Sequence, residues 1–253
     1  MIRNSSGFKQ VLGAALVAAA TLAAPAHAEV IGFEGYAGAV GGTEVWTEGN
    51  YSLGFYANVA GGGAGSLVGQ FINGDDSTCD SGSMACPVGH AGTYYGALND
   101  SYIDIVSETL AAFSVKSFDA AFIGGSPVLG SYPSVPALLR LQGILADGSY
   151  LLQDFALGGA TAGGFNFGHF ETTGSFADSA FVEVLAFGLV CNTAGSCSGF
   201  NSDRAQFGID NISLVEAGAT GDVPEPGTLA MLGLGLMGLA GARRRSRRSG
   251  KQS

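Results

Sequence analysis

The sequence has few of the residues that build common catalytic motifs. Its 253 residues include three histidines and four cysteines, and neither G-x-S-x-G nor H-E-x-x-H occurs. His90 and His169 have no serine or cysteine partner in any catalytic motif. Neither pair of cysteines has the C-x-x-C spacing, which argues against a zinc site. A carboxylate pair for glycoside hydrolysis stays open as an alternative, because the many acidic residues can meet in space. The acids considered for it are Asp104, Glu108, Glu171 and Glu183.

Basic residues are almost missing from the central part of the chain. All 21 acidic residues lie between Glu29 and Glu225, and only three bases, Lys116, Arg140 and Arg204, lie there with them. The formal charge of this part is therefore −18, against −10 for the whole chain. The electrostatic field of such a negative charge repels nucleic acid and anionic membranes, and it favours divalent cations and neutral or cationic partners. Solubility alone is the alternative explanation.

The N-terminus has the layout of a secretory signal peptide. Arg3 and Lys9 precede the apolar run Val11–Ala24, and Ala26-His27-Ala28 is a small-x-small cleavage site. We expect residues 1–28 to be removed by signal peptidase, so that the exported chain begins at Glu29. A buried N-terminal helix is the alternative.

The four cysteines lie in two local pairs within the exported part. An even number of cysteines in an oxidising compartment predicts two disulfides. Cys79 and Cys86 flank one Gly/Ser-rich turn, and Cys191 and Cys197 flank another. We therefore expect the pairs 79–86 and 191–197, although four cysteines allow three pairings.

The region 29–222 predicts one all-β domain, a jelly-roll-like β-sandwich. Its apolar segments are short, rich in aromatic and branched residues and bounded by glycine. Phe118, Ala120 and Phe122 share one face by alternation, and Asp147-Gly148 predicts a hairpin with a two-residue type I′ turn. The expected strands are 51–57, 66–72, 101–107, 117–125, 138–157 (two strands), 165–171 and 179–190.

The C-terminal region 223–253 resembles a PEP-CTERM sorting signal. The motif Pro224-Glu225-Pro226 is followed by the apolar segment Thr228–Ala242 and then by five arginines. A helix over that segment spans about 22 Å, less than the ~30 Å of a bilayer core, which suits a transient anchor. The arginines place the chain end in the cytoplasm. The resemblance implies processing by an exosortase, and an ordinary tail anchor is the alternative.

A second resemblance concerns Gln206, Phe207 and Asp210, which match the signature of the QFxxD group of PEP-CTERM proteins. The biochemical function of that group is unknown. Because PEP-CTERM sorting accompanies exopolysaccharide production, the resemblance implies a non-enzymatic envelope or matrix protein that is structural, adhesive or glycan-binding, with exopolysaccharide as a partner. A glycan-active hydrolase or lyase is the alternative.

The two ends of the domain suggest a calcium site. Gly32-Phe33-Glu34-Gly35 near the start and Phe207–Ile212 near the end are similar to carbohydrate-binding jelly rolls, in which the first and last strands lie side by side. That resemblance implies Glu34 and Asp210 as Ca²⁺ ligands, with Asn211 as a weaker third. Alternation slips near Asp210, which predicts a bulge there. A turn or capping role for Asp210 and Asn211 is the alternative.

Aromatic side chains in or beside loops are candidates for a sugar-binding platform, although aromatic residues also dominate β cores. These candidates are Trp46, Tyr51, Tyr56, Tyr94, Tyr95 and Tyr132.

Overall fold

The structure, a computed structural model, describes residues 28–57, 63–75, 79, 82–202 and 204–217. Residues 1–27 of the predicted signal peptide, the sorting motif and the apolar segment Thr228–Ala242 lie outside the described residues, whereas Ala28, the last residue of that peptide, is described. Among the residues it describes, no helix is long and apolar enough to cross a membrane.

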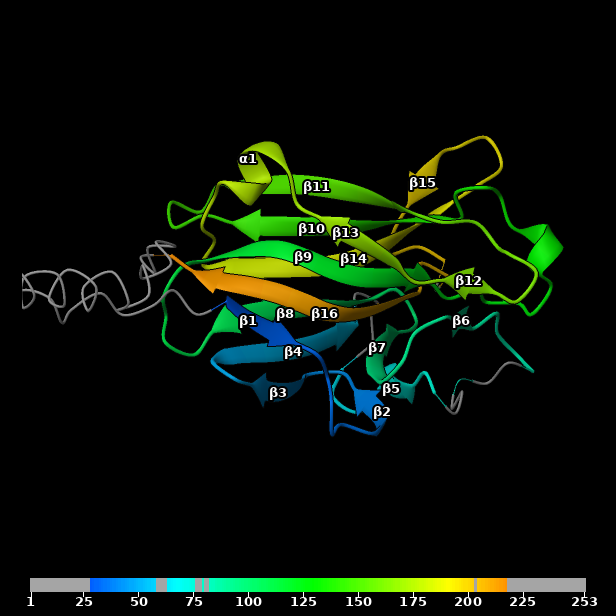
Figure 1. The fold of residues 1–253 in the computed structure, drawn as a ribbon, viewed down its shortest axis with the longest axis horizontal. Coiled ribbons are helices and arrows are strands. Elements are labelled where there is room, and N and C mark those ends of the chain that lie inside the picture. Colours follow the sequence, from blue (N-terminus) through cyan, green and yellow to red (C-terminus); the bar gives the residue numbers. More distant parts are fainter. Residues whose placement is uncertain (1–27, 58–62, 76–78, 80–81, 203, 218–253) are drawn as a thin grey trace, which may run out of the picture. The chain divides into compact units, whose positions relative to one another are not determined.

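Two antiparallel sheets pack face to face, which confirms the predicted β-sandwich (Figure 1). Sheet A runs in the order β13 (Gly168–Glu171), β9 (Phe113–Phe122), β16 (Phe207–Glu216), β7 (Thr93–Ala97), β5 (Leu67–Asn73) and β2 (Gly38–Gly41), and β1 (Ala28–Ile31) also pairs with β16. Sheet B runs in the order β11 (Tyr150–Leu157), β10 (Ala137–Ile144), β14 (Glu183–Cys191), β8 (Ser101–Ser107), β4 (Tyr51–Ala57) and β3 (Glu44–Glu48), and β15 (Cys197–Ser198) pairs with β14. The remaining elements are the short parallel pair β6 (Pro87–Val88) and β12 (Phe165–Asn166), the helix α1 (Gly174–Ala177) and the 3₁₀ turn η1 (Leu129–Ser131).

The core forms where alternate residues of the two sheets face each other. Phe118, Ala120 and Phe122 of β9 are all buried in it, as their spacing predicts. From sheet B, β10 contributes Leu139 and Leu141 by the same alternation. Burying this many aromatic and branched side chains between two sheets is the main source of the domain's stability.

The first and last strands are neighbours, as the resemblance to jelly rolls implies. β1 pairs with β16, and Ile31 lies opposite Ile212 (Figure 1). The register of β16 with β9 shifts between Asp210 and Ser213, and Asn211 has a φ of 50°, so the predicted bulge is present. Glu34 is not on the first strand. It lies in the turn after β1, between Phe33 (φ 53°) and Gly35 (φ 87°).

The hairpin between β10 and β11 forms where Asp147-Gly148 predicts it, but its turn differs. The amide of Gly148 donates to the carbonyl of Leu145 (2.9 Å), and the amide of Leu145 donates to Ser149 (2.8 Å). Gly148 alone has a positive φ, 82°. The connection is therefore a three-residue loop with a bulge, and the prediction of a two-residue type I′ turn is wrong. Asp147 accounts for the difference, because its Oδ1 accepts the Ser149 amide at 2.9 Å and favours the wider turn.

Both predicted disulfides are present, Cys79–Cys86 and Cys191–Cys197. The second joins the end of β14 to β15. The first belongs to a small apolar cluster outside the main core, in which Cys79, Cys86, Met84 and Phe167 pack against Ile72 of β5 and Tyr94 of β7. Ile72 and Tyr94 alternate with the core residues Phe71 and Tyr95, so this cluster covers the outer surface of sheet A, which we call the covered face.

Candidate functional site

The outer surface of sheet B, called the open face here, carries aromatic side chains on neighbouring strands. Tyr56 of β4, Tyr102 of β8 and Phe187 of β14 lie directly opposite one another in the strand register. The rings of Tyr56 and Tyr102 stack, with centroids 5.4 Å apart and planes 27° apart. Phe200, from the segment after β15, packs on Phe187 at 5.0 Å. A row of aromatic rings therefore crosses three strands.

Gly54 makes room for this row. It lies two residues before Tyr56 on the same face, opposite Asp104 of β8. A Cβ atom at Gly54 would meet the Tyr56 ring, at 2.9 Å from its hydroxyl oxygen. The ring of Tyr56 thus occupies the place of a side chain at position 54 and extends toward Asp104.

Two carboxylates lie beside the rings. Asp104 is opposite Leu185 and Glu183 is opposite Val106, so the two acids are diagonal neighbours on β8 and β14. Both are half-buried. Burial, and then the charge of Glu183, raise the pKa of Asp104 to about 6. The Oδ1 atom of Asp104 is buried and accepts no hydrogen bond within the described part of the chain. This unsatisfied oxygen destabilises the ionised carboxylate, in line with the raised pKa of Asp104.

The open face continues over β10 and β11 with mixed chemistry. Arg140 donates two hydrogen bonds to Asp154, at 2.6 and 2.7 Å. Tyr150 and Leu152 on β11 are 59% and 45% exposed. Such a surface can contact both the apolar and the hydroxyl-bearing sides of a sugar chain.

The sequence anticipated only part of this site. Among the six aromatic candidates, Tyr56 alone joins the stacked row of the open face. Tyr51, Tyr94 and Tyr95 are buried, Trp46 packs against Phe71 at 5.0 Å, and Tyr132 packs against Phe122 at 5.6 Å. Tyr102 was missed, although its alternation with the buried Ile103 and Ile105 places it outward. Of the four candidate acids, the structure places Asp104 and Glu183 together, while Glu171 is on β13 of the other sheet and Glu108 follows β8.

Asp210, the central residue of the predicted calcium site, pairs with a histidine instead. Its Oδ2 is 2.8 Å from Nε2 of His90, and the residue is 2% exposed. Burial raises the pKa of Asp210 to about 8. The negative charges of Asp119, Glu34 and Glu48 add to this shift, and a hydrogen bond from the backbone amide of Asn211 opposes it. Burial lowers the pKa of His90, against the effect of Asp119, Glu34 and Asp75. Both directions favour the uncharged forms of the two side chains. The two side chains are in contact, but Nε2 of His90 has no hydrogen-bond partner among the described residues.

The other two predicted ligands also have protein partners. The Asn211 amide donates to Oδ2 of Asp119 (2.8 Å), whose Oδ1 is 2.8 Å from Nδ1 of His169. Glu34 accepts the amide of Thr93 at 3.2 Å. In the described ranges no group of three or more His, Cys, Asp or Glu side chains is arranged to hold a metal ion. Glu34, Asp210 and Asn211 thus each have a partner within the protein, and calcium binding by them stays a hypothesis to be tested.

The residues of the QFxxD signature serve packing in this structure. Phe207 and Ile209 point into the main core, while Gly208 and Asp210 point toward the covered face. A Cβ atom at Gly208 would be 2.9 Å from the Phe167 ring and 3.1 Å from Tyr94. The carbonyl of Gln206 accepts the amide of Ile123 at 3.2 Å, and its side chain is buried. Membership of the QFxxD group stays a prediction.

Comparison with known families identifies the C-terminal segment. Residues 222–245 match the model of the PEP-CTERM protein-sorting motif. This chain carries a PEP-CTERM sorting signal. The signal marks an exported protein that is sorted by an exosortase and whose precursor is anchored in the membrane. No curated protein matches the chain.

Comparison with solved structures found several similar chains. A DUF4465 family protein from Bacteroides caccae has a TM-score of 0.50 and 14% identity, over 76% of this chain and 100% of that one. The C-terminal family 22 carbohydrate-binding module of Clostridium thermocellum Xyn10B has a TM-score of 0.34 and 10% identity, over 76% and 95% of the two chains. The CBM22-2 xylan-binding domain of Paenibacillus barcinonensis Xyn10C has a TM-score of 0.32 and 11% identity, over 75% and 99%. At these identities the likeness to the Bacteroides protein shows the fold alone.

Proposed function

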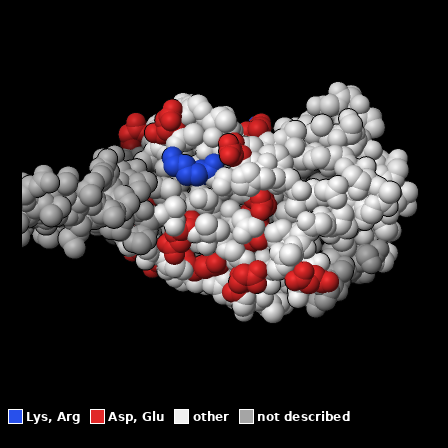
Figure 2. All heavy atoms as spheres, in the orientation of Figure 1, with Lys and Arg blue, Asp and Glu red and all other residues white. Residues whose placement is uncertain are grey.

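We propose that this exported protein is a non-enzymatic component of the extracellular matrix that binds exopolysaccharide through the open face of sheet B. The stacked pair Tyr56 and Tyr102 beside Asp104 is the observation that carries the proposal. Aromatic rings offer an apolar surface to a sugar ring, and a carboxylate accepts hydrogen bonds from its hydroxyl groups. The excess of acidic over basic residues, which Figure 2 shows on one face of the molecule, favours neutral or amine-bearing chains over anionic ones.

The test measures binding of the purified exported protein to immobilised exopolysaccharide from the producing cells. Replacing Tyr102 by Ala removes one ring of the pair, and we expect affinity to fall about tenfold, equivalent to roughly 1.4 kcal/mol. Leu110→Ala is the matched control, because Leu110 is 92% exposed and lies in the turn after β8, away from the rings. Unchanged binding by Tyr102→Ala, or no binding by the unaltered protein, would contradict the proposal.

A glycan-active hydrolase is the second candidate, favoured by the raised pKa of Asp104 beside Glu183. A carboxyl with a pKa near 6 can protonate a leaving oxygen while a second carboxylate acts as base or nucleophile. This candidate predicts release of oligosaccharides from the same exopolysaccharide. It also predicts that Asp104→Asn and Glu183→Gln each abolish that release while binding persists. Binding without any product release by the unaltered protein would leave only the first function.

A further inference from the structure

A cleft at one end of the sandwich is lined by hydrogen-bond donors that have no acceptor among the described residues. Its volume is about 500 Å³, within the usual range of small-ligand sites. Its walls come from the segment after β9, from the end of β14 with the turn that follows, and from the segment before β16. The aromatic rings and the two carboxylates described on the open face do not line this cleft.

Arg204 supplies the positive charge of the cleft. Of the three bases between Glu29 and Glu225, Lys116 donates to the carbonyl of Ala177 at 2.8 Å and Arg140 is paired with Asp154. Arg204 lines the cleft and has neither an ion pair nor a hydrogen bond to any described residue. None of the described residues that line the cleft is acidic. An unpaired guanidinium in a cleft with no acidic residue among its described lining favours an anion.

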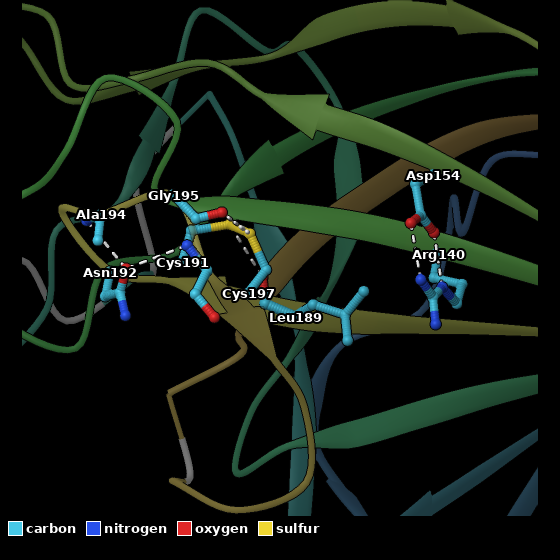
Figure 3. The surroundings of a disulfide bond; sticks show 9 residues. Arg140, Asp154, Leu189, Cys191, Asn192, Ala194, Gly195 and Cys197 are labelled. Carbon is cyan, nitrogen blue, oxygen red and sulfur yellow. Dashed lines mark hydrogen bonds and ion pairs between the residues drawn. A yellow bond between two sulfur atoms is a disulfide. The ribbon is translucent and has the colours of Figure 1, made fainter.

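Asn192 supplies a second donor. Its Oδ1 accepts the amides of Ala194 (2.9 Å) and Ser196 (3.1 Å), which fixes the side chain in the turn between β14 and β15 (Figure 3). The Nδ2 group is on the other side of the same planar amide and has no acceptor in the part of the chain that the structure describes. The disulfide Cys191–Cys197 closes this turn, so the donor is held in place.

One wall of the cleft is aromatic and rigid. The hydroxyl of Tyr132 accepts the amide of Ser126 (2.7 Å) and donates to its carbonyl (2.8 Å), and its ring packs on Phe122. Both rings line the cleft. A ring-shaped ligand can therefore pack against an apolar wall while it accepts hydrogen bonds from Arg204 and Asn192.

We propose that this cleft binds an acidic sugar, with the sugar carboxylate held by the guanidinium of Arg204 and the amide of Asn192. A planar guanidinium matches a carboxylate in two parallel hydrogen bonds. The open face presents Asp104 and Glu183 and repels such a group, so the two sites take sugars of different charge.

Calorimetric titration of the purified exported protein tests the assignment with three probes: digalacturonate, the neutral galactose disaccharide, and acetate. We expect digalacturonate to bind at least tenfold more tightly than either of the others. Equal binding of the acidic and neutral disaccharides would overturn the role of the carboxylate. Binding no tighter than that of acetate would overturn the sugar assignment, and so would an absence of digalacturonate binding.

Two substitutions locate the site. Arg204→Gln is expected to weaken digalacturonate binding at least tenfold, whereas Lys116→Gln makes the same charge change elsewhere and is expected to have no effect. Asn192→Asp keeps an oxygen for the amides of Ala194 and Ser196 but replaces the free donor by an acceptor, so we expect a similar loss with an unchanged melting temperature. Full affinity in Arg204→Gln, or an equal loss in Lys116→Gln, would overturn the proposal.

Discussion

Both outer surfaces of the sandwich combine a glycine with aromatic residues, but the combination has a different role on each surface. On the covered face, Gly208 admits the rings of Phe167 and Tyr94, which seal the surface of sheet A and bury the pair His90–Asp210. On the open face, Gly54 admits the ring of Tyr56, which stays half-exposed, while Phe200 packs over the other end of the row, at Phe187. A glycine that makes room for a neighbouring ring therefore serves packing on the covered face and the presentation of an aromatic ring on the open face.

Adding a methyl group at each glycine tests this comparison and gives the largest expected effect. Gly208→Ala places a Cβ against two rings in a closed layer, so we expect the free energy of unfolding to fall by about 1–3 kcal/mol. Gly54→Ala meets the far end of a half-exposed side chain that can turn away, and we expect a change below about 0.5 kcal/mol. Urea denaturation of both variants measures the difference.

Glycan binding is expected to respond in the opposite order. Gly54→Ala displaces the ring of Tyr56 from its position beside Tyr102 and should weaken exopolysaccharide binding, whereas Gly208→Ala should leave it intact in the folded fraction. Equal losses of stability in the two variants would show that the faces do not differ in the way described.

The sequence predicts those parts of the molecule that depend on neighbours along the chain. The alternation of Phe118, Ala120 and Phe122 identifies a core strand, and both disulfides close within short turns. The sites depend on strand register between distant segments. Tyr56 meets Tyr102 only through the pairing of β4 with β8, and Asp104 meets Glu183 only through that of β8 with β14.

Loop geometry is the second feature of the structure that the sequence does not predict. Asp210 lies near the bulge that the interrupted alternation of apolar residues predicts. Its partner His90 lies in a loop, and no hydrophobic periodicity predicts where that loop lies. Likewise, Glu34 sits in a turn because Phe33 and Gly35 adopt positive φ values, which a strand-like pattern does not reveal. A resemblance between sequence patterns therefore located Asp210 correctly without identifying what it contacts.

The buried pair His90–Asp210 predicts a dependence of stability on pH that extends to higher pH than that of the open face, where the pKa of Asp104 is about 6. The pKa of Asp210 is about 8 in the folded protein and near 3.9 when unfolded, so its stabilising contribution is complete below about pH 4 and is lost as pH rises through about 8. Between pH 6.5 and 8, we expect the free energy of unfolding to fall by about 1 kcal/mol per pH unit. The lowered pKa of His90 acts only below about pH 6.5, where it opposes this trend.

Asp210→Asn removes the titrating group and keeps its shape, so its stability should be nearly constant from pH 6.5 to 8. The charged groups around the pair, Asp119, Glu34, Glu48 and Asp75, are unaltered in this variant. Asp154→Asn on the open face is the control and should retain the slope of the unaltered protein. The same slope in Asp210→Asn would exclude Asp210 as its source.

Removal of calcium is expected to have the smallest effect on stability. Its outcome decides whether Asp210 is a metal ligand or a buried partner of His90. A calcium ion at a hundred times its dissociation constant would stabilise the folded state by about 2.7 kcal/mol, enough to raise the melting temperature by several degrees. Because Asp210 contacts His90 and Asn211 donates to Asp119, we expect a chelator to change the melting temperature by less than about 1 °C. A stabilisation by several degrees that Asp210→Asn abolishes would instead establish the calcium hypothesis, because only a ligand of the folded state produces it. It would also require Asp210 to be ionised, which contradicts the neutral pair and the pH slope that follows from it.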